Sequence, residues 1–360
     1  MTFRKIMTGS AAGFGLLALG FSASAHAQED RCETYPLPTA TAPAELGWTP
    51  NELSRLDALA NELNSTALMV VQNGQVVFEH GETDRLIMVH SLRKSLMSAL
   101  IGLLVDAGAL SLDASLADLG IDDLAGLTDE ERTATVRDVI MARSGVYIPS
   151  AAETPQMRES RPERGEFAPG EHWYYNNWDF NVAGHIFERA SGRNYDSAFL
   201  RVFAEPLCMP DFDVFETHRQ HAPGTMFSAY HMRLSARDTA LFGQLFLQEG
   251  EWEGEQILSA DWVRESTADY SDTGWPGAWM GGYGYMWWRP ADAEIADEHG
   301  LAADMYTGAG YGGQYVTVIP SLDLVIVNRM NTDIPDGPRM GGRDYTSILR
   351  AVIAASMSDD

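Results

Sequence analysis

The clearest hydrophobic pattern in the chain is the run ALMVVQNGQVVFEH, residues 67–80, in which two valine-rich arms flank Asn73-Gly74. Asn-Gly is the dipeptide that two-residue hairpin turns prefer, because both turn positions have positive φ. The pattern therefore predicts two antiparallel strands joined by a tight turn.

A helical period follows directly after this hairpin. Between Ser91 and Ala107, leucines recur at helical spacing, and Gly108 stands just past the last of them, where helices commonly end. We predict a buried, amphipathic helix whose apolar positions include Leu92, Leu96, Leu100, Leu103 and Leu104.

The remaining patterns place helices in the middle of the chain and strands towards its end. Helical stretches are predicted over residues 136–142, 182–190, 236–248 and 260–267, strands over 283–288, 314–319 and 324–328, and a final helix over 345–356. Strands at both ends of the chain predict an α/β (α+β) fold, an antiparallel sheet flanked by helices with an inserted, mostly helical region. The sheet domain would be discontinuous, made of residues 28–90 and 276–360, with 91–275 as the helical region.

Residues 1–27 have the layout of a secretory signal peptide. Arg4 and Lys5 precede an apolar run over 11–21, and Ala25-His26-Ala27 is a small-residue cleavage site. The run is short for a bilayer span, so we predict cleavage near Ala27, an exported protein that is periplasmic or secreted, and no integral membrane span afterwards. An uncleaved signal anchor is the alternative.

The composition of the chain excludes some classes of binding partner. The formal charge of −26 would repel nucleic acid and anionic membranes, so neither is expected as a partner. The nine histidines show no metal-ligand spacing, and no cofactor or metal is expected. An exported chain can hold a disulfide between its two cysteines, Cys32 and Cys208, although their spacing does not decide whether they meet.

Lysine usage points to one position. The chain contains only Lys5 and Lys94, so signal cleavage would leave Lys94 alone among arginines. Arginine keeps its proton in a protein, whereas a desolvated lysine can lose its own and act as a base. A single retained lysine therefore indicates a role that arginine cannot fill.

Lys94 belongs to an S-x-x-K motif, Ser91-Leu92-Arg93-Lys94, at the start of the predicted helix. An i,i+3 spacing places hydroxyl and amine on one helical face, and a nearby base converts a weak serine nucleophile into a strong one. Ser91 as a helix N-cap beside a solvated lysine is the alternative. His90 is adjacent to Ser91, but neighbouring helical residues point apart, so packing or positional support is the expected role of His90.

Two further elements carry candidate chemistry. Tyr175 and Asn177 form a Y-x-N motif, in which a phenol can move a proton to a leaving group and an amide can hold substrate or lysine; Tyr174 competes for the role of the phenol. The second element is the glycine-rich run YTGAGYGGQ, residues 306–314.

This glycine run matches G-x-G-x-x-G over residues 308–313, but a dinucleotide site needs a strand before the motif and a helix after it. Here a strand follows the run and the chain is nearly over. We interpret the run as an edge strand stripped of side chains, so that backbone N–H groups can approach a substrate carbonyl. A glycine-rich hairpin or bulge is the alternative.

Together, these three elements resemble the serine β-lactamase, penicillin-binding-protein and esterase superfamily, especially its class C-like branch and the 6-aminohexanoate-dimer hydrolase group. The segments VIMARSGV (139–146), PLCM (206–209) and GYGYMWW (282–288) are similar to that branch's "LLxMtSGv", "PLGM" and "GYGYxWW". The resemblance covers about residues 43–355.

The resemblance implies an acyl-enzyme route. Ser91 would attack an ester or amide carbonyl, Lys94 would accept its proton, and Tyr175 would pass a proton to the leaving group. The oxyanion would lie between the N–H of Ser91 and that of Tyr311, or of Ala309 if the alignment shifts. Gly310 and Asn177 would also contact the substrate, which we expect to be a small ester or a linear amide.

One departure from the family pattern bears on the substrate. Many relatives have Lys or His at the head of the third motif, where it receives a substrate carboxylate, but this chain has Tyr306-Thr307-Gly308. The departure favours esters or linear amides, unless Arg329 or Arg343 reaches the site. A β-lactamase or D-Ala-D-Ala carboxypeptidase is the first alternative, and a non-catalytic binding protein with the same fold is the second.

Overall fold

The computed structural model describes residues 32–275 and 280–357. The predicted signal peptide, 1–27, lies outside this range. From Tyr35 onward the chain forms one compact unit, and its division into a sheet domain and a helical region stays a proposal. Neither described cysteine is a free thiol, because Cys32 and Cys208 are both disulfide-bonded. Within the described ranges, no helix has the length and apolarity that a bilayer crossing requires.

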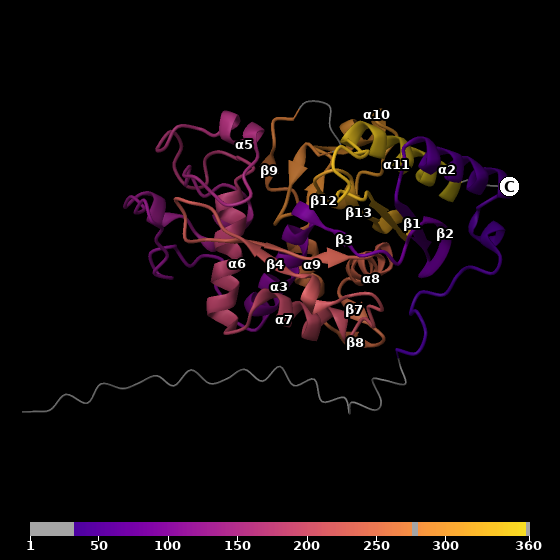
Figure 1. Ribbon diagram of the computed structural model, residues 1–360, viewed down its shortest axis with the longest axis horizontal. Coiled ribbons are helices and arrows are strands. Elements are labelled where there is room, and N and C mark those ends of the chain that lie inside the picture. The colour runs from indigo at the N-terminus through magenta and orange to yellow at the C-terminus, as the bar shows by residue number, and fades with distance from the viewer. Residues whose placement is uncertain (1–31, 276–279, 358–360) are drawn as a thin grey trace, which may run out of the picture. The chain divides into compact units, whose positions relative to one another are not determined.

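An eight-stranded antiparallel sheet organises this unit, which confirms the predicted fold class (Figure 1). The strand order is β2-β1-β14-β13-β12-β11-β10-β9. The predicted hairpin is present, and its turn residues Asn73 and Gly74 have φ of 50° and 70°. The strands are β1 (Ala67–Gln72), β2 (Gln75–Gly81), β9 (Ser271–Asp272), β10 (Gly282–Tyr283), β11 (Trp288–Arg289), β12 (Tyr306–Gly310), β13 (Gln314–Ile319) and β14 (Leu324–Arg329).

Helices cover both faces of the sheet. Helices α2 (Pro50–Glu62) and α11 (Gly342–Ser356) pack together over one face, and α8 (Ala236–Leu247) packs on β1, β13 and β14 over the other. Because successive strand side chains point to opposite faces, Met69 and Val71 of β1 join the α8 side whereas Leu68 and Val70 join the α2–α11 side. All of β1 is therefore buried.

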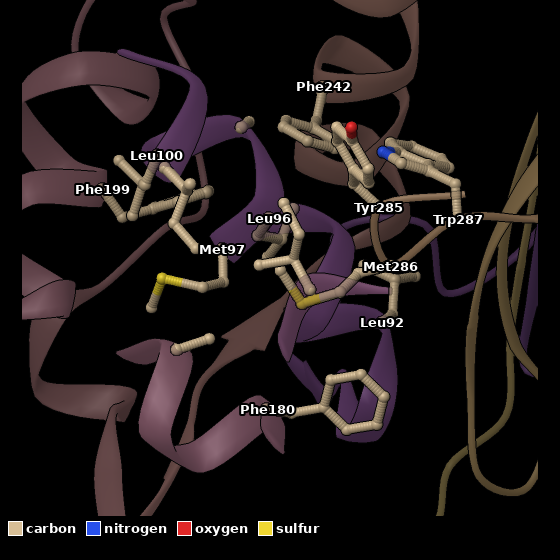
Figure 2. Packing of buried hydrophobic residues seen from close by; sticks show 14 of the residues in the cluster. Leu92, Leu96, Met97, Leu100, Phe180, Phe199, Phe242, Tyr285, Met286 and Trp287 are labelled. Atoms are coloured by element: carbon tan, nitrogen blue, oxygen red, sulfur yellow. The ribbon is translucent and has the colours of Figure 1, made fainter. Parts of the chain in front are cut away.

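The helix that carries the S-x-x-K lysine lies at the centre of the helical region. It begins as a 3₁₀ turn, η2 (His90–Leu92), and continues as α3 (Arg93–Asp106). The prediction of an amphipathic helix is wrong, because every residue from Arg93 to Gly102 is buried. Figure 2 shows its leucines surrounded by side chains from several other segments. A helix enclosed on all sides has no solvent face.

The strand predicted over 283–288 is also wrong. The segment forms only two short strands at its ends, β10 and β11, and between them Met286 turns the chain with φ of 65°.

Helix α2 was not predicted, although Thr49 and Glu52 form a capping box with Pro50 at its first turn. The remaining elements are η1 (Pro43–Leu46), β3 (Ile87–Met88), η3 (Glu131–Thr133), α4 (Val136–Ile140), α5 (Pro155–Ser160), α6 (Asn177–Ser191), α7 (Tyr195–Phe199), η4 (Leu200–Ala204), η5 (Val214–Glu216), β4 (His218–Gln220), β5 (Ala229–His231), β6 (Arg233–Leu234), β7 (Glu251–Trp252), β8 (Glu255–Gln256), α9 (Ala260–Ser266), α10 (Ala293–Glu298) and η6 (Pro320–Leu322).

Candidate active site

The S-x-x-K serine and lysine meet at the junction of η2 and α3. Lys94 Nζ lies 3.2 Å from Ser91 Oγ. Ser91 is partly exposed, whereas Lys94 is only 1% exposed. Ser91 lies in the 3₁₀ turn rather than in the first turn of an α-helix, and this turn still brings hydroxyl and amine together across the i,i+3 spacing. The hydroxyl of Ser91 is therefore accessible to a substrate, whereas the amine beside it is buried.

Lys94 has two more polar neighbours, and both come from the Y-x-N motif. Its Nζ lies 2.7 Å from the hydroxyl of Tyr175 and 2.8 Å from Oδ1 of Asn177. The ring of Phe180 lies 4.1 Å below the amine, a contact that favours a cation by about 0.5–2 kcal/mol, but burying an unpaired charge costs several kcal/mol. Burial, reinforced by the charge of Arg93, holds the pKa of Lys94 well below its usual range. Burial therefore favours the neutral form of the amine.

The choice between the two adjacent tyrosines is settled by geometry. Tyr174 donates its hydroxyl hydrogen to the carbonyl of Met157, away from the lysine, whereas Tyr175 faces Lys94. Burial raises the pKa of Tyr175 to about 12, against smaller lowering effects of a hydrogen bond with Ser91 and the charge of Arg93. Tyr175 thus remains a neutral phenol near pH 7, next to an amine whose neutral form burial favours.

The start of α6 fixes the Y-x-N residues. Asn176 caps this helix by accepting the N–H of Trp178, and its amide donates to the carbonyl of Val146. Asn177, the first residue of α6, donates through Nδ2 to the carbonyl of Ala152, which leaves Oδ1 for Lys94. The backbone carbonyl of Ala152 therefore orients the amide of Asn177 toward the lysine.

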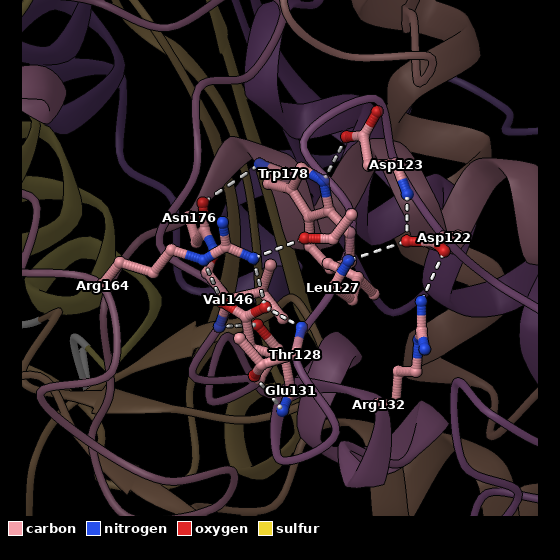
Figure 3. Close-up of polar contacts among 12 residues, drawn as sticks. Asp122, Asp123, Leu127, Thr128, Glu131, Arg132, Val146, Arg164, Asn176 and Trp178 are labelled. Atoms are coloured by element: carbon pink, nitrogen blue, oxygen red, sulfur yellow. Dashed lines mark hydrogen bonds and ion pairs between the residues drawn. The ribbon is translucent and has the colours of Figure 1, made fainter.

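Two buried carboxyl groups hold the surrounding loops. Asp179 accepts from Ser144 Oγ and from Asn176 Nδ2, which joins the 139–146 segment to α6. Asp123 accepts the indole N–H of Trp178 at 2.8 Å and the hydroxyl of Thr225 at 2.7 Å. Figure 3 shows Trp178 between Asn176 and Asp123. Trp178 is therefore a structural residue rather than part of a pocket wall.

The glycine run places β12 directly against the serine. A Cβ on Gly310 would lie 2.2 Å from the carbonyl oxygen of Val89 and 3.1 Å from the nitrogen of Leu92, and one on Gly308 would lie 3.0 Å from Ser95 Oγ. The expected close backbone approach is thus present. The description as an edge strand is wrong, since β12 lies between β13 and β11, although it pairs with β11 only at Thr307.

Gly310→Ala tests this close approach. The added methyl group meets fixed backbone on the serine-bearing turn, so we expect a loss of about 1–3 kcal/mol of stability and at least a tenfold slower reaction of Ser91 with a fluorophosphonate probe. The control is Gly254→Ala, where nothing lies within 4 Å of the new Cβ and only a φ of 82° is strained. Slowing of the control as large as that of Gly310→Ala would contradict the expected clash.

The other predicted residues of the third motif lie at the opening of the site. Ala309 is partly exposed, Gly310 is buried and Tyr311 is 63% exposed. The Tyr311 ring contacts the ring of His90 edge-on, with centroids 5.5 Å apart, and His90 Nε2 lies 2.8 Å from Thr332 Oγ1. His90 thus supports the loop of Tyr311 rather than contacting the hydroxyl of Ser91.

The arginines differ from what the sequence suggested. Arg329 is fully buried and donates to Gln314, Thr239 and the carbonyl of Ile87, so its guanidinium is not available to a substrate. Arg343 is exposed on the first turn of α11. Arg339, which sequence reasoning missed, has its Cδ 2.8 Å from the Cβ position of Gly312, next to Tyr311.

A row of aromatic rings leads from Tyr175 to the surface. Trp288 lies 5.4 Å from Tyr175, and Trp275 stacks on Trp288 at 5.1 Å. Trp275 is 44% exposed, whereas Trp173, which contacts all three rings, is buried. Within the described ranges, no group of acidic, histidine or cysteine side chains is arranged to hold a metal.

Comparison with known proteins identifies the family. Residues 54–349 match the beta-lactamase family, and the chain belongs to it. The 6-aminohexanoate-dimer hydrolase of Paenarthrobacter ureafaciens is 26% identical over 343 residues, covering 83% of this chain and 84% of that enzyme. The predicted family resemblance is thereby confirmed.

Solved structures show the same fold. A class C beta-lactamase in complex with cefoxitin matches with a TM-score of 0.62 at 15% identity, over 87% of this chain and 99% of that one. A penicillin-binding protein homologue from Caulobacter crescentus also has a TM-score of 0.62, at 16% identity, over 86% of this chain and 98% of that one.

Proposed function

We propose that the protein is a serine hydrolase that cleaves a small ester or a linear amide through an acyl-enzyme. The observation that carries this proposal is the buried amine of Lys94, which contacts both the hydroxyl of Ser91 and the phenol of Tyr175. A lysine enclosed in this way is costly to a fold and is useful as a base. The 6-aminohexanoate-dimer hydrolase name of a relative supports the linear-amide reading.

The hydrogen inventory of the three groups supports a proton relay. A neutral lysine has two N–H hydrogens and one lone pair. Asn177 Oδ1 and the Tyr175 oxygen accept the two hydrogens, which leaves the lone pair for the hydroxyl hydrogen of Ser91. As Ser91 Oγ bonds to the substrate carbonyl carbon, the hydroxyl proton passes to Lys94. When the bond to the leaving oxygen or nitrogen breaks, Tyr175 gives its proton to that atom and takes one from Lys94.

Water then reverses these steps. The same amine and phenol take a proton from the attacking water, the acyl–Oγ bond breaks, and the proton returns to Ser91. The oxyanion formed in each half-reaction would accept from the N–H of Ser91 and that of Tyr311, with Ala309 as the alternative donor. The close approach of Gly310 to the backbone of Val89 and Leu92 supports this proposal, since Gly310 and Leu92 adjoin the two donors in the sequence.

The opening of the site favours an uncharged substrate. Tyr306, at the head of the third motif, is buried, and its hydroxyl donates to the carbonyl of Phe246, so no cation occupies that position. The rings of Trp288 and Trp275 offer an apolar wall beside Tyr175. An acyl or leaving group with alkyl or aromatic carbon would bury surface there.

Arg339 favours the second candidate, a β-lactamase or D-Ala-D-Ala carboxypeptidase that binds a substrate carboxylate. Its guanidinium already donates to the carbonyl groups of Thr332, Ile334, Gly337 and Pro338, so we rank this candidate second. A non-catalytic binding protein is the third, and it would have no use for a buried, unpaired lysine. We further propose that the protein is exported and that it binds neither nucleic acid nor a cofactor.

A substrate panel on purified protein separates these candidates. We expect kcat/KM for p-nitrophenyl butyrate to be at least about tenfold higher than kcat/KM for nitrocefin. The reason is that the described site offers no free cation to bind the carboxylate of the β-lactam. Linear amide oligomers form the third arm. Rapid nitrocefin opening without ester turnover would place the β-lactamase candidate first. If no substrate is turned over and a fluorophosphonate does not label Ser91, the non-catalytic binding protein is the candidate that remains.

A further inference from the structure

Arg93, the residue before the lysine of the S-x-x-K motif, is a buried cation without a counter-ion. It is 2% exposed, and its Nη1 donates to the carbonyl of His90 at 3.1 Å. Its Nε and Nη2 have no hydrogen-bond partner, and among the described residues no ion pair includes it. The guanidinium lies 5.2 Å from the centre of the Tyr230 ring. A charge in this setting costs several kcal/mol, which calls for a functional reason.

The position of Arg93 next to Lys94 supplies that reason. Both side chains are buried and reach consecutive residues of η2, Arg93 Nη1 the carbonyl of His90 and Lys94 Nζ the hydroxyl of Ser91, so two positive charges there would repel each other in a medium of low dielectric. Arginine cannot release its proton in a protein, whereas lysine can. The lysine of such a pair is therefore the group that becomes neutral, as happens when a catalytic lysine stands beside a second cation.

We infer that Arg93 is a positioning residue that keeps the Lys94 amine unprotonated near neutral pH, and so sets the pH range in which Ser91 reacts; this inference rests on the proposed function. The side chain acts through Lys94 and does not touch the substrate.

Among residues 32–275 and 280–357, no acid on an element that packs against α3 pairs with Arg93. On α6, Asp179 is held by Ser144 and Asn176, and Glu188 pairs with Arg219 of β4. On α9, Glu265 pairs with Arg137 and Asp261 with Arg264. On α7, Asp196 accepts from Thr217 and from the N–H of Ser197, and β12 contributes the neutral phenol of Tyr306.

The histidines around Arg93 are neutral as well. Burial and the charge of Arg93 lower the pKa of His231, on β5, to about 2 and that of His90, on η2, to about 4. Tyr175 is a neutral phenol. Beside these neutral histidines and this neutral phenol, Arg93 carries a positive charge at neutral pH.

A purely structural role is the competing explanation. Arg93 Nη1 holds the carbonyl of His90, whose φ of 49° is unusual for a residue with a side chain, and this turn carries Ser91. Glutamine can keep a hydrogen bond to this carbonyl without a charge, and methionine keeps only the length of the side chain. Lysine can carry the charge but, unlike arginine, can also release it. The three variants therefore separate charge from shape.

The test is the second-order rate of labelling of Ser91 by a fluorophosphonate, measured from pH 5 to pH 10 on the wild type and on Arg93→Lys, Arg93→Gln and Arg93→Met. Removing the cation raises the pKa of Lys94, so the base is protonated over a wider range. We expect the midpoint of the acidic limb to move upward by about one unit or more in Arg93→Gln and Arg93→Met. Arg93→Lys, whose amine can itself release a proton in this buried setting, should have a midpoint between those of the wild type and the neutral variants. Below the midpoint, the neutral variants should react at least about tenfold more slowly.

Equal midpoints in all four proteins would overturn the inference, even if the maximal rates differ. Unfolding of both neutral variants with a folded Arg93→Lys, measured by thermal denaturation, would assign the charge to stability and would also overturn it. A wild type that the probe does not label refutes the proposed function itself, which distinguishes the two failures.

Discussion

Replacing Ser91 with alanine is expected to abolish fluorophosphonate labelling and to lower kcat/KM for an ester by at least about 10³-fold. The variant removes the hydroxyl oxygen that we propose as the nucleophile while leaving Lys94, Tyr175 and the fold in place. Thermal stability should change little, because Ser91 Oγ contacts the lysine at a long 3.2 Å and is partly exposed.

Ser98→Ala is the matched control. Ser98 lies on the same helix, is fully buried and has no hydrogen-bond partner for its hydroxyl. The control should be labelled at the wild-type rate. Labelling of the Ser91→Ala protein, located by mass spectrometry at another residue, would refute the assignment of the nucleophile.

Replacing Lys94 by arginine or by methionine should each lower kcat/KM and the labelling rate by about 10³-fold or more. Arginine preserves the positive charge but cannot accept a proton, so it should not rescue the reaction. Methionine removes a buried amine with no counter-ion, so Lys94→Met should be as stable as the wild type or more stable. Loss of activity without loss of stability is the expected signature of a catalytic group.

Activity of Lys94→Met within tenfold of the wild type would show that another group accepts the proton. The phenol of Tyr175 would be the first candidate, since it lies beside both groups.

Much of this architecture could be predicted, because the relevant signals are local. Asn73-Gly74 requires positive φ at both turn positions, and the alternation of β1 follows from a sheet buried on both faces. The S-x-x-K spacing places Ser91 and Lys94 together in either a 3₁₀ or an α-helical turn. The Y-x-N motif favours Tyr175 over Tyr174, but only the tertiary contacts show that the hydroxyl of Tyr175 lies against Lys94 and that of Tyr174 against the carbonyl of Met157.

The errors share a physical cause: segments far away in the sequence bury residues that look exposed in the sequence alone. Helix α3 was predicted to be amphipathic because leucines recur at helical spacing, yet the inserted helices and the sheet bury every residue from Arg93 to Gly102. For the same reason Arg93 was overlooked, since a buried arginine and an exposed one look alike in the sequence. The glycines at 308 and 310 indicated close backbone approach correctly, but not that β11 would continue the sheet beyond β12.

The most direct test is an NMR titration of the Lys94 side chain in protein labelled with ¹³C-lysine. The chain contains only two lysines, and a protein that starts after the predicted cleavage site near Ala27 contains Lys94 alone, so the assignment is immediate. We predict that its Cε signal shows a neutral amine at pH 8 and titrates well below the usual lysine pKa of about 10.4. A signal that titrates at about that ordinary value would show a solvated ammonium, and Lys94 could not be the base.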